Sequence, residues 1–189
     1  MHRFPLRAAA LLVAIWFAPV PLPAQSAAQR QELERFRDSL AAQHDVAALR
    51  AIEVDLIGRA RQDRANALLH LRLGFLALRL GELTTGSEAS RHFDDAGGEF
   101  EWATQEQPNW PYGWYGLGFA ELALGDSEVA LVSGLQTMVG KDALTRSANA
   151  VARSAEVDPG FVAGLVELSS TALRQRVNLR MDVALAALR

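Results

Sequence analysis

Apolar residues recur at helical spacing along most of the chain. The first apolar stripe consists of Leu33, Phe36 and Leu40, separated by Arg, Glu and Gln. This pattern predicts an amphipathic helix over residues 27–43. Asp45 is suited to cap a second helix, which we expect to continue to about Gln62. The two helices are predicted to form an antiparallel pair.

A longer helix is predicted over residues 110–126, opened by Pro111 and closed by Gly125. Proline suits the first helical turn, and glycine suits the left-handed residue after a helix. This segment is apolar on two faces, so it must be covered on two sides. Gly116 and Gly118 are poor helix formers, which indicates that another helix packs closely against the backbone there.

The sequence pattern of this helix occurs twice in the chain. Residues 66–82 align with residues 110–126 at one constant interval, with Gly74 on Gly118 and Gly81 on Gly125. The aligned apolar positions are Leu68 with Tyr112, Leu71 with Tyr115, Phe75 with Phe119, and Leu78 with Leu122. We therefore expect two equivalent helices. A weaker third copy follows Pro159 and includes Leu165 and Leu168.

A second helix follows each of the two clear copies. These helices are predicted over residues 96–108 and 147–159, and each ends at a proline, which disfavours helical geometry in the residue before it. Phe100 aligns with Val151. The chain is therefore predicted to be an array of paired helices.

Several residues resemble the signature of the tetratricopeptide repeat. They are Trp114, Leu117-Gly118 and Gly125 in a first helix, and Ala96, Phe100, Ala103 and Pro108 in a second helix. The resemblance implies an all-α fold, a right-handed superhelix of helical hairpins. The predicted divisions of the chain are a signal peptide at 1–24, an N-terminal hairpin at 25–65, and, from the resemblance, repeats at 66–108, 111–159 and 160–189, the last one incomplete. The interval from Gly74 to Gly118 exceeds the ~34 residues of the usual repeat. We predict a loop near 82–95 and an added or prolonged helix within 126–146.

In this family the first helices of successive repeats line a concave groove that binds protein or peptide segments. The resemblance implies that the groove residues here are Leu68, Leu71, Phe75, Tyr112, Tyr115, Phe119 and Leu122. Tyrosine offers a large contact area with a polar tip, which favours a binding role for the aromatic rings. The alternative is that the N-terminal helices or the inserts fill the groove and these rings belong to the core.

Residues 1–24 have the layout of a secretory signal. Arg3 and Arg7 precede an apolar run from Ala8 to Val20 that is too short for a confident membrane span. We predict cleavage after Ala24, with Ala28 as second choice, and export to the periplasm or the extracellular space. An uncleaved N-terminal anchor is the alternative. The sequence has no cysteine, so the exported domain depends on packing without disulfides.

No catalytic or cofactor-binding site is predicted from the sequence. The sequence lacks a nucleophile elbow and a phosphate-binding loop in a strand–turn–helix setting, so no enzyme activity, cofactor or metal is expected. The net charge of −3 with a single lysine, Lys141, gives no support for nucleic-acid binding. His92 with Asp95, Glu99 and Glu101 is the one cluster with metal-ligand residue types, and a solvated polar segment is the favoured interpretation.

The leading hypothesis is an exported scaffold that binds a protein segment in its apolar, aromatic groove. The alternative is a structural N-terminal arm of a longer secreted protein whose missing C-terminal domain carries the activity. This is considered because the last repeat stops before its Ala-to-Pro portion and solenoids normally end with a polar capping helix. Neither the partner nor the oligomeric state follows from the sequence.

Overall fold

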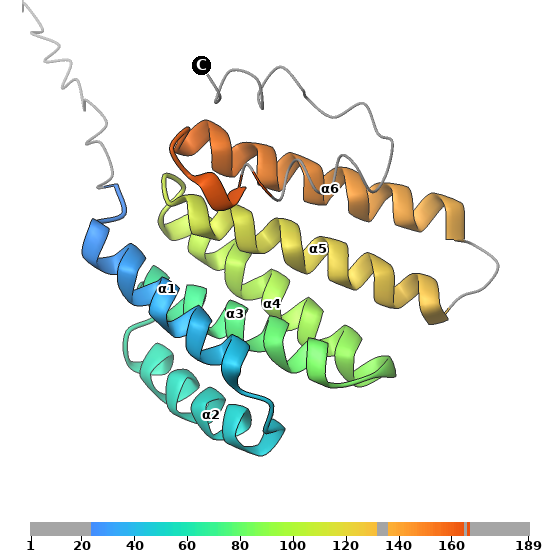
Figure 1. Ribbon diagram of the computed structural model, residues 1–189, viewed down its shortest axis with the longest axis horizontal. Coiled ribbons are helices and arrows are strands. Elements are labelled where there is room, and N and C mark those ends of the chain that lie inside the picture. The colour runs from blue at the N-terminus through green and yellow to red at the C-terminus, as the bar shows by residue number, and fades with distance from the viewer. Residues whose placement is uncertain (1–23, 132–135, 165, 167–189) are drawn as a thin grey trace, which may run out of the picture.

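The described part of the chain consists of helices joined by short turns. The computed structural model describes residues 24–131, 136–164 and 166, which contain six long α-helices, a helical segment that begins at Val162, and no strand (Figure 1). The helices are α1 (Ala27–Ala42), α2 (Val46–Gln62), α3 (Ala67–Leu83), α4 (Gly86–Glu106), α5 (Pro111–Leu131) and α6 (Gln136–Val157). They pack in neighbouring pairs, which confirms the all-α prediction. The predicted signal before residue 24 and the third copy beyond residue 166 lie outside the described residues.

Polar side chains fix where the first three helices begin. Ser26 forms a capping box with Gln29 at the start of α1, and the Asp45 side chain accepts a hydrogen bond from the backbone N–H of Ala47 at 2.8 Å. Asn66 accepts from the N–H of Leu69 at the start of α3. Each cap satisfies a backbone donor that the helix leaves unpaired. The predicted bounds of these helices, and the cap at Asp45, are confirmed.

Close helix contacts in the stack from α3 to α6 depend on glycine. The buried ring of Phe100 on α4 lies between Gly74 of α3 and Gly116 of α5, where added Cβ atoms would stand 2.7 and 2.2 Å from ring carbons. Val151 of α6 takes the corresponding place on Gly118, at 2.4 Å. This confirms the expectation that another helix packs against the backbone at Gly116 and Gly118.

The predicted loop over 82–95 is wrong, because α4 already begins at Gly86. The turn is confined to the residues around Thr84 and Gly86, and Gly86 adopts the left-handed conformation with φ of 62°. The ring of Phe93 explains the longer helix: it packs on Gly81 of α3, where a Cβ would lie 2.4 Å from a ring carbon. The contact of this partly buried ring with α3 offsets the weak helical pattern of the polar residues around it.

The predicted helix end at Gly125 is also wrong, since α5 continues to Leu131. Gly125 is buried inside the helix and faces α6, where its Cβ would stand 2.5 Å from that of Ala143. The prediction of a prolonged helix is thereby confirmed as far as Leu131. The following helix, α6, begins at Gln136, well before the predicted start at Ser147.

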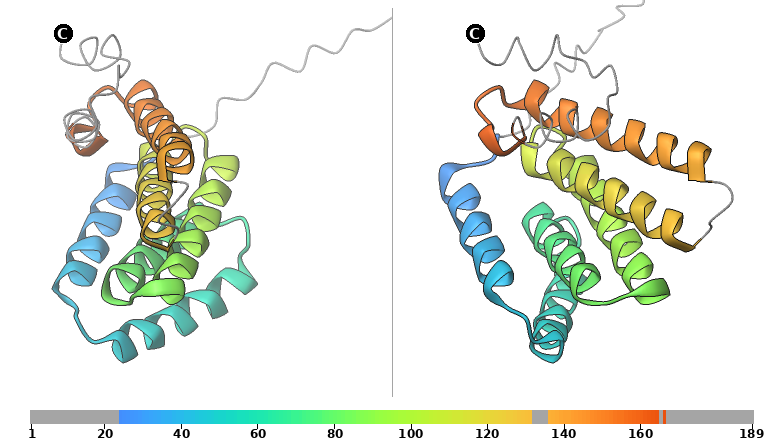
Figure 2. Two further views of the ribbon diagram at one scale, coloured as in Figure 1. Left: turned by 90° about the vertical axis from the view of Figure 1, so that its right-hand side faces the viewer. Right: turned by 45° about the vertical axis from the view of Figure 1, so that its right-hand side comes forward.

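The predicted pairing of the first two helices needs correction. Both α1 and α2 pack mainly on α3, and they diverge from the turn that joins them (Figure 2). The apolar faces of the two helices explain this arrangement, because both are buried in the same core as α3. The buried leucines are Leu33 and Leu40 of α1 and Leu49 and Leu56 of α2. No helix of the described residues is long and apolar enough to cross a membrane.

Candidate functional site

The predicted groove residues occupy one face of α3 and α5, and α1 covers much of that face. Leu71, Phe75, Tyr112 and Tyr115 are buried, whereas Leu68, Phe119 and Leu122 are partly exposed. The rings of Phe75 and Tyr112 meet edge to face with centroids 6.3 Å apart. The equivalent helices of the two copies thus contribute rings to one cluster.

Arg37 of α1 lies against this aromatic cluster. Its guanidinium carbon is 4.7 Å from the ring centroid of Phe75 and 5.2 Å from that of Tyr115, and its Nη2 donates to the Tyr115 hydroxyl at 3.3 Å. Cation–π attraction of this kind is strengthened by partial burial. Arg37 therefore binds α1 to both α3 and α5.

Glu34, one turn earlier on α1, accepts a hydrogen bond from the Tyr112 hydroxyl at 2.6 Å. Burial of the Tyr112 ring, together with this bond to a carboxylate, raises the pKa of the tyrosine above its ordinary value. The hydroxyl therefore stays protonated and remains a donor to Glu34 even in alkaline solution, where an ordinary tyrosine would ionise.

Two further contacts hold the ends of α1. Arg30 pairs with Asp158 in the turn after α6. Arg79 of α3 donates to the backbone carbonyl of Gln43 at 3.0 Å, at the C-terminal end of α1, where a cation is favoured by the helix dipole. Helix α1 thus spans from α3 to the turn that follows α6.

Beside α1 a cleft of about 260 Å³ remains open. Its apolar side chains include Phe75, Leu78, Tyr115 and Phe119, and its charged ones come from both α1 and α3. The full lining is Glu34, Arg37, Asp38, Leu40, Ala41, Phe75, Leu78, Arg79, Glu82, Tyr115 and Phe119. We call this space the α1 cleft. Three of the predicted groove residues, Phe75, Tyr115 and Phe119, line it.

Several residues of this site were not predicted. Arg37 and Glu34 come from α1, and Phe161 packs on Tyr112 with ring centroids 4.7 Å apart. A signal for Arg37 was present, because it follows Phe36 and sits one helical turn beyond Leu33, beside the apolar stripe of α1. At that position the aliphatic part of the side chain can cover apolar surface while the guanidinium extends beyond it.

The histidines do not form a metal centre in the described residues, where no group of three or more potential ligands converges. Nδ1 of His70 lies 2.6 Å from a carboxylate oxygen of Glu99, and Nε2 lies 2.9 Å from the carbonyl oxygen of Arg64. The ring is buried and stacks on Trp102 at 4.7 Å. The hydrogen bond to Glu99 raises the pKa of His70, and burial opposes that shift.

Comparisons with known proteins give no relative: no family model, no curated protein and no solved structure matches this chain.

Proposed function

We propose that this chain is an exported, tetratricopeptide-like scaffold that binds a protein segment through the part of the aromatic face of α3 and α5 that α1 leaves open. Its support is the repeated packing of the two copies. Phe100 on Gly74 and Val151 on Gly118 are equivalent contacts at aligned positions. Paired helices that stack in this way create a continuous face for binding.

The observation that carries the proposal is that an amphipathic helix, α1, already lies on this face. Leu33 and Leu40 are buried, while Glu34 and Arg37 contact Tyr112 and Tyr115. The face therefore has the shape and the polar groups to hold a helix in a groove. The open α1 cleft, next to Phe119, offers space for an apolar side chain of a partner.

The test uses the partly exposed lining of the α1 cleft. Leu78→Ala with Phe119→Ala removes apolar contact area from the open lining and one edge-to-face contact with Tyr115, while Phe75, Tyr112 and Tyr115 themselves are kept. We expect about tenfold weaker capture of a specific partner, the loss produced by ~1.4 kcal/mol. Affinity purification from the native envelope, quantified by mass spectrometry, measures the capture, and circular dichroism checks that helicity is unchanged.

The matched control is Val54→Ala with Val162→Ala, two exposed side chains outside the cleft with exposures of 71% and 67%. If both double variants recover the same proteins in the same amounts as the unchanged chain, binding through the α1 cleft is refuted.

Export belongs to the same proposal, with cleavage after Ala24. This site leaves Ser26 and its capping box with Gln29 intact, whereas cleavage after Ala28 would remove the cap and place a positive terminus in the first turn of α1. Losing such a cap costs about 0.5–2 kcal/mol, and a cation there opposes the helix dipole. N-terminal sequencing of the exported protein tests it, with Gln25 as the expected first residue.

A further inference from the structure

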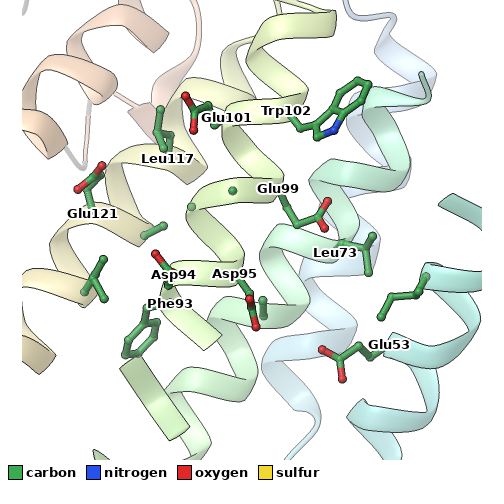
Figure 3. A pocket seen from close by; sticks show the side chains of 16 residues that line it. Glu53, Leu73, Phe93, Asp94, Asp95, Glu99, Glu101, Trp102, Leu117 and Glu121 are labelled. Atoms are coloured by element: carbon green, nitrogen blue, oxygen red, sulfur yellow. The ribbon is translucent and has the colours of Figure 1, made fainter. Parts of the chain in front are cut away.

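A second cleft, of about 690 Å³, crosses α4 on the opposite side of α3 and α5 from α1 (Figure 3). Helices α2, α3, α4 and α5 all contribute to it. We call it the α4 cleft. None of the predicted groove residues lines it. It is therefore a different surface from the one that carries the proposed function.

The floor of the α4 cleft is apolar and shallow over α4 itself. Leu73 of α3 and Leu117 of α5 lie on either side of α4, and Gly97 and Gly98 leave the middle of that helix without side chains. A Cβ on Gly98 would have no neighbour within 4 Å. The two glycines thus join the apolar surfaces beside α4 into one trough.

Trp102 gives this trough an exposed aromatic wall. One face of its ring is stacked on His70 with an interplanar angle of 2°, so the ring is held in place, yet 37% of the residue is exposed. Ile57 of α2, also lining the cleft, is 36% exposed. A fixed aromatic ring beside an open apolar floor is typical of a binding site for an apolar or cationic side chain.

The charges of the α4 cleft all have one sign. Among the described residues, its lining includes six carboxylates and no lysine or arginine: Glu53, Asp94, Asp95, Glu99, Glu101 and Glu121. Glu99 bonds to His70 and Glu121 pairs with Arg146. The other four form no ion pair or hydrogen bond within the described part of the chain. Elsewhere arginine and glutamate pair repeatedly, as Arg50 does with Glu88.

The negative charge of four unpaired carboxylates in one cleft is larger than the net charge of −3 carried by the whole chain. A cleft with walls of one sign focuses the field and attracts ligands of the opposite charge. An acidic rim around an apolar floor is therefore complementary to a segment that carries both basic and apolar side chains.

We propose that the α4 cleft binds a cationic amphipathic segment of a partner protein. Basic side chains of that segment pair with Asp94, Asp95 and Glu101, and an apolar side chain lies on the floor between Trp102 and Leu117. The inference does not depend on the aromatic face under α1, because it uses other residues, another face and a partner of defined charge.

The probe is a synthetic amphipathic helical peptide of leucine and lysine, labelled with fluorescein, and binding to the full exported chain is measured by fluorescence anisotropy. Asp94→Asn with Asp95→Asn should weaken binding about tenfold and reduce its salt dependence, since two of the attracting charges are lost. The matched control, Asp55→Asn with Glu88→Gln, changes the net charge equally at carboxylates outside the cleft, and should bind as the unchanged chain does.

Trp102→Ala tests the apolar wall: it should weaken the peptide several-fold and leave the salt dependence unchanged. The indole N–H signal of Trp102 in ¹⁵N spectra should move when the peptide is added. Leu78→Ala with Phe119→Ala, the variant that tests the α1 cleft, should not alter peptide binding.

Three results would overturn the inference. Equal weakening by the charge-matched control would show that overall charge alone attracts the peptide. Equal binding of a leucine and glutamate peptide would show that the carboxylates are not recognised. Loss of binding in the Leu78→Ala, Phe119→Ala variant would place the peptide in the α1 cleft instead.

Discussion

At the scale of single residues, the closest contacts are those between a glycine backbone and a neighbouring ring. Phe100 is fully buried and lies against Gly74 on one side and Gly116 on the other. The ring has no room to move away from an added atom on either helix. The glycine in each contact is therefore as important to packing as the ring.

Gly116→Ala should destabilise the fold by about 1–3 kcal/mol, the range for overpacking in a tight core. The new Cβ would stand 2.2 Å from a carbon of the Phe100 ring. Urea unfolding followed by circular dichroism measures the change.

The control is Gly58→Ala on α2, where a Cβ would meet nothing within 4 Å. Alanine is there favoured over glycine by about 0.5–1 kcal/mol through helix propensity, so this variant should be slightly more stable. Equal effects of the two substitutions would contradict the role of Gly116 in close packing.

The pair of His70 and Glu99 makes stability depend on pH. Both ring nitrogens face acceptors, Glu99 and the carbonyl of Arg64, so the charged imidazolium satisfies both. Because the hydrogen bond to Glu99 raises the pKa of His70 in the folded state, the folded chain holds the proton more tightly than the unfolded one. The stabilisation is complete below the unfolded pKa of about 6.5 and is lost as pH rises through the folded pKa.

The free energy of unfolding should therefore decrease as pH rises above about 6.5, measured by urea titrations from pH 5.5 to 9. Glu99→Gln should remove most of this decrease. The control is His44→Gln, at an exposed histidine, which should follow the unchanged chain. A pH dependence that persists in Glu99→Gln would assign the effect to other groups.

The packing role of Gly116 and Gly118 could be predicted from the sequence, whereas the His70 contacts could not. Glycine inside a strongly apolar helix is costly, so it points to a close neighbour without naming that neighbour. The contacts of His70 with Glu99 and Trp102 join α3 to α4 through side-chain placement. No local pattern encodes such a placement.

At the scale of helices, α1 differs from the rest in how it is held. It packs on α3 and reaches α5 through Arg37 and Glu34. Its apolar contribution is narrow, because Leu33 and Leu40 are its buried apolar residues. Such an element is expected to open more readily than the stacked helices around it.

Leu33→Ala should release α1 selectively. Leucine-to-alanine changes in a core cost about 2–5 kcal/mol, and the lost contacts belong to α1. Hydrogen–deuterium exchange should accelerate over residues 27–42 before it changes in α4 or α5. Val54→Ala on the exposed side of α2 should leave the exchange pattern unaltered. Uniform acceleration across all helices would show that α1 is an inseparable part of the core.

Helix ends were predictable where caps specify them and not where tertiary contacts do. Asp45 and the prolines at 108 and 159 gave correct local limits. The sequence predicts a helix end at Gly125, because glycine serves both at helix ends and at close contacts. Only the approach of Ala143 distinguishes the two. The early start of α4 likewise depends on Phe93 meeting Gly81, which its polar neighbours do not reveal.

At the scale of the whole molecule, Phe100 connects the two copies of the predicted repeat. Its ring contacts Gly74 in the first copy and Gly116 in the second, and it meets Phe75 edge to face at 4.9 Å. Val151, at the aligned position in α6, lies on Gly118 of α5. The side chains at the aligned positions therefore differ in the number of helices that they contact. Phe100 contacts helices on both sides of α4, and Val151 contacts α5.

Phe100→Ala should cost about 3–5 kcal/mol, the range for removing a buried aromatic ring, and should increase hydrogen exchange in α3 and α5 together. Val151→Ala removes fewer atoms from one side only, so its cost should be smaller and its exchange effect confined to α5 and α6. If Phe100→Ala loosened only α4, the two copies would be coupled by other contacts. The continuous face required by the proposed scaffold would then not depend on this ring.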